Sequence, residues 1–278
     1  MRSFKIVVDS CCELPGKYKD DPRIEVVPFT MEVGERLVVD DHTFNQKQFL
    51  KWIAECPTCP KSACPSPERY MEACQTEAED VYIVTISSKL SSSYNSALLG
   101  RDMYLESETK NIHVCDSEAA VSGEGQLALK AIELAEQGLP FAQVVKRLEA
   151  FRDEVRTYFV LDNLETLRKN GRLTGVKALV VSTLNIKPVM SAVKGAIVQK
   201  GQSIGTKKAL TKMVDIVLRE RPDSAASRLL IAHCNSPERA QAVKKMIEER
   251  AKYKEIFILE TKGLSTMYTN DGGVVIGV

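Results

Sequence analysis

Short apolar runs that alternate with amphipathic segments constrain the fold of this 278-residue chain more than any other feature. Runs with the length and apolar content of buried strands lie at residues 5–8, 81–86 and 112–115. Residues 126–136 and 141–154 instead repeat apolar side chains at the three-to-four-residue spacing of helices. Strands that alternate with helices favour a parallel sheet between helical layers. We therefore predict an N-terminal, mainly parallel, three-layer α/β domain over residues 1–155.

The second half of the chain mixes strands and helices. Its predicted strands lie at 157–160, 187–190, 196–198, 228–231 and 256–259, and its predicted helices at 206–220 and 237–250. This pattern predicts a C-terminal mixed α/β domain over residues 156–278, with a last strand that can return to the domain interface. Because no low-complexity linker separates the halves, we expect a packed interface that can enclose a ligand. Within the first domain, residues 24–40 are expected to hold a hairpin that turns near Gly34.

Composition and charge exclude some classes of function. The chain is 44% hydrophobic and 27% charged, which is ordinary for a globular protein, and its net charge is +1. Nucleic-acid binding is not expected, because it needs clustered Lys and Arg and no basic stripe or aromatic platform is visible. No apolar run approaches the roughly 20 residues that cross a bilayer, and no signal peptide precedes the first strand. We therefore expect a cytoplasmic protein.

The eight cysteines lie scattered in a chain without export signals, so reduced thiols are the default expectation. Cys56, Cys59 and Cys64 are close enough in sequence to supply three zinc ligands, with Cys74 as a fourth. A second Cys-x-x-Cys pair and a neighbouring histidine are both missing. Free loop cysteines are therefore favoured over a metal site.

The three histidines are isolated in the sequence. His42 lies in a polar turn, His113 in a predicted strand and His233 at the end of an apolar run. Because no partner group lies close in sequence, each histidine is expected to have a structural rather than a catalytic role.

Hydroxyl groups cluster where an apolar strand meets a helix. Serines crowd residues 85–97, and from Ser91 onward the apolar residues share one helical face. A helix N-terminus offers unpaired N–H groups and a partial positive charge, which together can hold a carboxylate or phosphate. The alternative is that one serine caps the helix and the others are solvated, but a cap needs only one hydroxyl. Ser62 lies in a loop before Ser66-Pro67, a typical helix start, and is free for a similar role.

Six segments recur in the order of a known family. They are Asp9-Ser10, residues 61–68, residues 85–97, Asp116-Ser117 with residues 122–125 downstream, residues 161–172, and residues 185–188 followed by Gly195. From Lys5 to Val278 the chain resembles the DegV family of bacterial fatty-acid-binding proteins, which includes the B subunit of bacterial fatty acid kinase. The resemblance implies a two-domain DegV-like fold with a long-chain fatty acid, such as palmitate, between the domains. It also implies that a separate ATP-dependent kinase subunit converts the presented carboxylate to an acyl phosphate.

The resemblance also indicates which residues hold the carboxylate. Ser62 stands where the family has threonine in Thr-Ser-Gln-Pro-Ser, and Ser91 matches a serine of Ile-Ser-Ser-Gly-Leu-Ser-Gly-Thr-Tyr. Both hydroxyls are expected to donate to the carboxylate, assisted by the backbone N–H of Ser92, where the family usually has glycine. Arg168 is expected to support the head-group network or to meet the kinase subunit. As a general pattern, its surroundings indicate only a charged helix end closed by Gly171.

The C-terminal segment departs from the family pattern. Many members carry Gly-Thr-His there, and our alignment places Asn270 against the histidine that takes part in the head-group site. Asparagine can donate a hydrogen bond to a carboxylate but cannot carry a proton at neutral pH. Ala63 and Cys64 also replace the usual Ser-Gln. A second function therefore stays open, namely a carrier of another apolar carboxylic acid without kinase coupling.

Two enzyme classes match parts of the sequence less well. Residues 123–128 satisfy a loose dinucleotide-binding pattern, but they do not directly follow a strand. A serine hydrolase or acyltransferase could use the same serines, or Ser191 with Lys194, but no Gly-x-Ser-x-Gly elbow occurs. No phosphate-binding glycine-rich loop with lysine is visible either, so ATP chemistry would come from a partner. We predict a lipid-binding protein without catalytic residues, whose only small molecule is the fatty acid.

Overall fold

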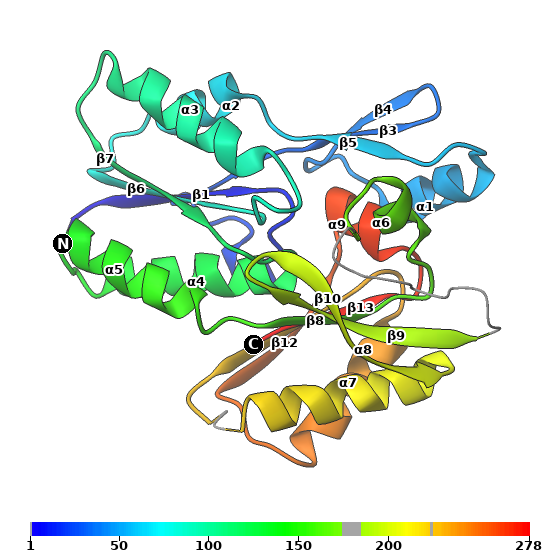
Figure 1. Cartoon of the computed structure of the whole chain (residues 1–278). Helices are drawn as coiled ribbons and strands as arrows, with labels where there is room; N and C mark the ends of the chain where they lie inside the picture. The colour runs from blue at the N-terminus through cyan, green and yellow to red at the C-terminus, as the bar shows by residue number, and fades with distance from the viewer. Residues whose placement is uncertain (1, 174–184, 223–224) are drawn as a thin grey trace.

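The N-terminal half is built on a parallel sheet. The computed structural model describes residues 2–173, 185–222 and 225–278 (Figure 1). The sheet has the order β2-β1-β6-β7 and all its strand pairs are parallel. Its strands are β1 (Phe4–Asp9), β2 (Ile24–Val27), β6 (Asp80–Thr85) and β7 (Asn111–Asp116). The predicted parallel sheet is therefore confirmed.

Helices cover both faces of this sheet. On one face lie α2 (Pro67–Ala73) and α3 (Ser93–Leu105), and on the other lie α4 (Ser122–Glu136) and α5 (Phe141–Arg152) (Figure 1). Pro67 occupies the first turn of α2, as the Ser66-Pro67 pair predicts, because its fixed φ suits that position. The first half is thus a three-layer α/β arrangement.

The C-terminal half is built on a mixed sheet with the order β10-β9-β8-β13-β11-β12. Its strands are β8 (Thr157–Val160), β9 (Ile186–Val193), β10 (Ala196–Ile204), β11 (Arg228–His233), β12 (Glu255–Glu260) and β13 (Val274–Gly277). Among the described pairs, β11 and β12 run parallel and the others antiparallel. Helices α7 (Thr206–Glu220) and α8 (Pro237–Glu248) pack on one face of this sheet (Figure 1). The mixed character predicted for this half is confirmed.

Helix α4 lies between the two sheets and packs on both. It contacts β1 and β6 of the first sheet and β11 and β13 of the second. A methyl group on Gly123 would lie 2.0 Å from Thr157 Oγ1, and one on Gly125 would lie 2.3 Å from the Glu13 carbonyl oxygen. These glycines stand inside a buried helix, so their role is close packing and not a phosphate-binding turn.

A small antiparallel sheet is formed by three further strands of the N-terminal half. It has the order β4-β3-β5, from β3 (Thr30–Val33), β4 (Arg36–Val39) and β5 (Lys61–Ala63). The hairpin turns at Gly34, whose φ of +61° favours glycine. The prediction was too broad at its start, because residues 24–27 form β2 of the parallel sheet and the hairpin spans only 30–39. The prediction of a loop at Ser62 was also wrong, because β5 pairs with β3 there.

None of the described helices is long and apolar enough to cross a membrane. A short 3₁₀-helix spans Gly16–Tyr18. Three further α-helices complete the described chain. They are α1 (Gln46–Glu55), α6 (Glu165–Lys169) and α9 (Gly263–Thr269). The predicted boundary near residue 155 falls between α5 and β8, and whether each half folds alone stays a prediction. One apolar core extends from Phe4 in the first sheet to Val275 in β13, which contacts α4.

Candidate ligand-binding site

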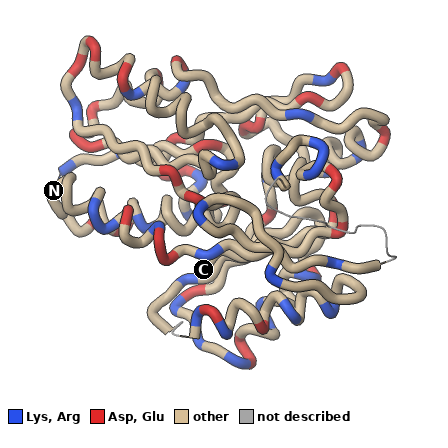
Figure 2. The backbone as a smooth tube through the Cα atoms, in the orientation of Figure 1, with Lys and Arg blue, Asp and Glu red and all other residues tan. Residues whose placement is uncertain are grey.

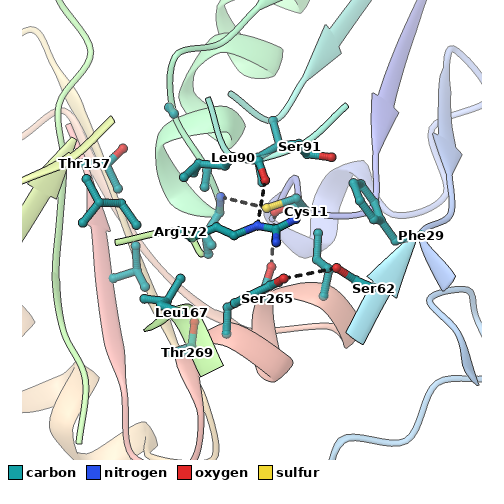
Figure 3. A pocket seen from close by; sticks show the side chains of 18 of the residues that line it. Cys11, Phe29, Ser62, Leu90, Ser91, Thr157, Leu167, Arg172, Ser265 and Thr269 are labelled. Carbon is teal, nitrogen blue, oxygen red and sulfur yellow. Dashed lines mark hydrogen bonds between the residues drawn. The ribbon is translucent and has the colours of Figure 1, made fainter. Parts of the chain in front are cut away.

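A cavity of about 340 Å³ lies between the two halves of the molecule (Figure 3). Its wall is largely aliphatic and aromatic and comes from loops that follow strands of the parallel sheet, from the mixed sheet, from the small sheet and from α9. The aliphatic and aromatic lining residues other than Tyr268 are Phe29, Ala63, Ile86, Leu90, Ala119, Ala120, Val121, Phe159, Leu161, Leu167, Ala192, Ile197, Leu264 and Val275. The volume falls within the range of small-molecule sites, roughly 300–1,000 Å³. Such a wall suits an apolar ligand.

Polar side chains gather at one part of this wall. Figure 3 shows Ser91, Ser62 and Ser265 around the side chain of Arg172, with Thr157 on the far side. The Ser62 hydroxyl lies 3.2 Å from the phenol oxygen of Tyr268, which also lines the cavity. Hydroxyl groups and a guanidinium are the donors that a carboxylate needs when it leaves water. The arrangement can therefore hold a molecule with an apolar tail and an anionic head.

The start of α3 brings Ser91 and Ser92 to the cavity. The Ser91 hydroxyl accepts a hydrogen bond from the N–H of Ser93 at 3.1 Å, so it caps the helix. Its own proton remains available for a ligand. Within the described ranges, the N–H of Ser92 has no hydrogen-bond acceptor in the protein. The structure thus places Ser62, Ser91 and Ser92 on one cavity, and their contact with a carboxylate stays a prediction.

The two arginines after Leu167 have different environments. Arg168 is exposed on α6 and donates to the Glu165 carboxylate from Nε at 2.9 Å and Nη2 at 2.7 Å, and it does not line the cavity. Arg172 does line it, and its Nε donates to the Leu90 carbonyl oxygen at 3.1 Å (Figure 3). Gly171, at φ +74°, turns the chain back so that Arg172 reaches the cavity. The sequence contains that signal, but our prediction named Arg168 only.

Asn270 also lies outside the cavity lining. It ends α9 at φ +55°, and its side-chain amide donates to the Tyr268 carbonyl oxygen at 3.2 Å. The polar residues of α9 that line the cavity are Ser265, Tyr268 and Thr269. These three residues lie on the face of α9 that is turned toward the cavity. Our sequence prediction did not include these residues, because it considered only Asn270, the residue aligned with the family's histidine.

Two buried carboxylates of the N-terminal half hold the start of α9. Asp40 accepts from the N–H groups of Gly263 and Leu264, each at 2.7 Å, and Glu13 accepts from the N–H of Lys262 at 2.6 Å. Burial raises the pKa of Asp40 and raises that of Glu13 to about 7. The position of the cavity-lining helix therefore depends on contacts between the two halves.

A second buried carboxylate pair lies behind the cavity wall. Asp9 accepts from the N–H of Cys11 at 3.1 Å, the N–H of Ile86 at 2.9 Å and the hydroxyl of Ser93 at 2.7 Å. Glu124 is fully buried beside it, and burial together with the charge of Asp9 raises its pKa well above the usual range. The ionised form of Glu124 is therefore disfavoured in the folded protein, and neither of its carboxyl oxygens has a hydrogen-bond partner among the described residues.

The residues considered for serine chemistry are not assembled as a catalytic pair. The Ser191 hydroxyl is buried and donates to the Thr157 carbonyl oxygen at 2.8 Å. Lys194 points to solvent and pairs with Asp153 at 3.0 Å. A Ser-Lys pair needs the two groups within hydrogen-bond distance, so this arrangement does not activate Ser191.

The cysteines are all free thiols in the structure. Cys56 lies 3.2 Å from the Thr58 hydroxyl, Cys59 contacts Asn170, and Cys64 lines the cavity. In the described part of the chain, the groups of metal-ligating atoms that converge do not include these three cysteines.

The comparison with protein families decides where this chain belongs. The family model described as "Uncharacterised protein, DegV family" matches residues 3–278, which is nearly the whole chain. The chain belongs to the DegV family. A DegV domain-containing protein of Streptococcus pneumoniae is 33% identical over 282 residues, covering 99% of this chain and 98% of that protein.

Solved structures of DegV proteins confirm the fold. A Ruminococcus gnavus DegV protein, refined with vaccenic acid, superposes with a TM-score of 0.97 at 45% identity and covers 100% of both chains. The Streptococcus pneumoniae Fatty Acid Kinase (Fak) B3 protein, loaded with linoleic acid, gives a TM-score of 0.88 at 31% identity and covers 99% of this chain and 98% of its own. The DegV assignment made from the six sequence segments is therefore confirmed.

Proposed function

We propose that this DegV protein binds one long-chain fatty acid in the cavity between its halves. The observation that carries the proposal is a largely apolar cavity of about 340 Å³ whose hydroxyl and guanidinium groups gather at one part of the wall. A tail of about fourteen methylenes would contribute on the order of 10 kcal/mol before binding costs are subtracted, at ~0.8 kcal/mol per buried CH₂. The tail therefore supplies affinity, and the polar groups fix the direction of the molecule.

The carboxylate is assigned to the donors around Arg172. The Ser91 hydroxyl and the N–H of Ser92 each have a proton to offer, and the N-terminus of α3 adds a partial positive charge. Ser62 and Tyr268 share a hydrogen bond of 3.2 Å, so one of these two hydroxyls donates to the other and the second proton is left for the carboxylate. Arg172 supplies the only full charge that we assign to this head-group site. No formal ion pair is required, because several neutral donors can satisfy a buried carboxylate.

The ligand is expected to be unsaturated. Two relatives above 30% identity were solved with vaccenic acid and with linoleic acid, and both of these acids are unsaturated. Palmitate, which the resemblance suggested, becomes the saturated comparison ligand.

Presentation of the carboxylate to a kinase subunit is the second part of the proposal. It is supported by the likeness to the Fak B3 protein along nearly the full length of both chains. Helix α6 carries exposed basic residues, including Arg168, one turn before the cavity-lining Arg172 (Figure 2). This DegV protein itself would be a binding subunit without catalytic residues or cofactor, and Arg168 would contact the partner.

Mass spectrometry of an organic extract tests the binding function directly. The natively purified protein is expected to retain about one equivalent of an unsaturated fatty acid, and a Ser62→Ala/Ser91→Ala variant is expected to lose most of it. Ser107→Ala is the matched control, since Ser107 is exposed and lies outside the cavity. If the wild-type protein retains no lipid even after incubation with a fatty-acid mixture, the proposal is refuted.

A kinase assay separates the two alternatives that remain. Loaded protein mixed with a fatty acid kinase catalytic subunit and ATP is expected to form acyl phosphate, which hydroxylamine traps as a hydroxamate. Fatty acid that is bound but never phosphorylated would favour a carrier without kinase coupling. Hydrolysis of activated acyl esters by the protein alone would instead favour a serine-dependent acyl hydrolase or transferase.

A further inference from the structure

A group of metal-ligating side chains lies on the outer edge of the parallel sheet, away from the cavity. His113 and Cys115 are two positions apart on the edge strand β7, so their side chains point to the same face. That face is covered by α5, which places Glu149 opposite them. The Nε2 atom of His113 lies 2.9 Å from Oε1 of Glu149. One ligand atom from each of the three residues lies within 4.8 Å of the other two.

The donor set is one that zinc prefers. Imidazole nitrogen, thiolate sulfur and carboxylate oxygen are the ligand types of zinc sites in proteins. Zn–N and Zn–O bonds of about 2.1 Å and a Zn–S bond of about 2.3 Å place tetrahedral ligand atoms roughly 3.4–3.6 Å apart. The histidine and glutamate atoms are slightly closer than that, and the sulfur atom needs to approach by up to roughly 1.4 Å.

The site is open on one side and supported on the other. The side chains of His113 and Glu149 are 20% and 31% exposed, whereas Cys115 is buried, so an ion can enter from solvent and keep a water ligand. Arg152 bonds the other carboxylate oxygen of Glu149. A carboxylate held in this way is oriented toward the metal, as in the outer shells of known sites. Arg152 is also a positive charge near the ion, and the thiolate and carboxylate ligands together offset the two positive charges of zinc.

We propose that His113, Cys115 and Glu149 bind one Zn²⁺ ion, with water as the fourth ligand. Binding replaces the proton on the Cys115 sulfur, which is released to solvent as the Zn–S bond forms. Because the thiol loses its proton on binding, affinity is expected to increase with pH. The alternative is a plain network in which Glu149 accepts from His113 and Arg152 without an ion. The proposal is independent of fatty-acid binding, because none of the three ligands lines the cavity.

Cobalt titration distinguishes these alternatives, because a Co²⁺–thiolate bond gives a charge-transfer band and a tetrahedral Co²⁺ ion absorbs in the visible. The metal-free protein is prepared with Cys56→Ser and Cys59→Ser, since these partly exposed thiols can also bind cobalt. One equivalent of Co²⁺ is expected to produce both signals, and Zn²⁺ is expected to displace it. The apparent affinity is expected to increase by at least about tenfold between pH 6 and pH 8.

Variants assign the signal to this site. Cys115→Ser is expected to abolish the charge-transfer band, and His113→Gln or Glu149→Gln to weaken binding by about 10-fold or more. Cys64→Ser is the matched control and is expected to keep the band, because Cys64 lies in the cavity wall. Circular dichroism confirms that each variant is folded. No band at millimolar cobalt, or a band that persists in Cys115→Ser, would overturn the proposal.

Discussion

Replacement of Glu13 by glutamine is expected to stabilise the protein at alkaline pH. The Glu13 carboxylate is 1% exposed and accepts a hydrogen bond from the N–H of Lys262 at 2.6 Å. Glutamine keeps a carbonyl oxygen for that bond and removes the charge. Burial is the main cause that raises the pKa of Glu13 from 4.5 to about 7. The charge is therefore unfavourable in the folded protein.

The size and sign of the effect follow from proton linkage. Between pH 4.5 and about 7, the folded state binds the Glu13 proton and the unfolded state has released it, so stability falls as pH rises. Each pH unit between the two pKa values is worth about 1.4 kcal/mol, which gives ~3 kcal/mol in total. The penalty is absent below pH 4.5 and complete above pH 7. Glu13→Gln should therefore gain ~3 kcal/mol more at pH 8 than at pH 4.5.

Equilibrium urea unfolding at pH 4.5, 6 and 8 measures this difference. The free energy of unfolding of Glu13→Gln is compared with that of wild type and of Glu35→Gln, an exposed control. Asp9 and Asp40 also have raised pKa values, but both residues are present in the wild type and in the two variants. Their contribution to the pH dependence of stability is therefore common to all three proteins. Asp40 is close enough to Glu13 to be affected by its charge, so part of the gain will appear through Asp40. A pH dependence in Glu13→Gln that equals that of wild type would refute the reasoning.

Three further substitutions test the packing and the buried acids, each by urea unfolding with the same exposed control. Asp40→Asn should lower the free energy of unfolding by about 1–3 kcal/mol, because one of two buried N–H groups of α9 loses its acceptor. Asp40→Asn should also weaken fatty-acid retention. Unchanged retention would mean that the position of α9 does not affect ligand binding. Gly123→Ala should cost about 1–3 kcal/mol, since the new methyl group meets Thr157 at 2.0 Å, and a neutral effect would contradict the close packing. Glu124→Gln should cost less than about 1 kcal/mol at pH 7, because a neutral amide replaces a buried carboxyl group whose pKa is raised, and a loss of several kcal/mol would contradict the idea that burial disfavours its charge.

Local patterns in the sequence were sufficient for much of the fold. The predicted helix at residues 206–220 matches α7 at both ends, and the strand at 157–160 matches β8. Apolar spacing identifies such elements because each buries one side against a sheet. The pattern could not assign residues 24–27 to the parallel sheet, because pairing with β1 is a long-range choice that the local sequence does not encode.

The candidate site shows the same division between local and long-range information. Ser62 and Ser91 could be chosen from motifs, and the structure brings both to one cavity. Tyr268 could not, because its approach depends on the docking of α9. Arg172 could have been chosen, since Gly171 marks the turn that brings it to the cavity, but our prediction named Arg168 only. The His113 cluster was also missed, since Glu149 is 36 positions away in the sequence.

The placement of α4 has a consequence for how the molecule can be divided. Twelve of its fifteen residues are buried, because one side faces the parallel sheet and the other faces the mixed sheet. A fragment ending at residue 155 would keep this helix but expose its second apolar side to water. We therefore expect such a fragment to aggregate and the intact chain to melt in a single cooperative transition. For the same reason, we expect that splitting the chain near its midpoint, or inserting another domain there, will prevent folding. Insertion in the hairpin at residues 34–35 is expected to be tolerated.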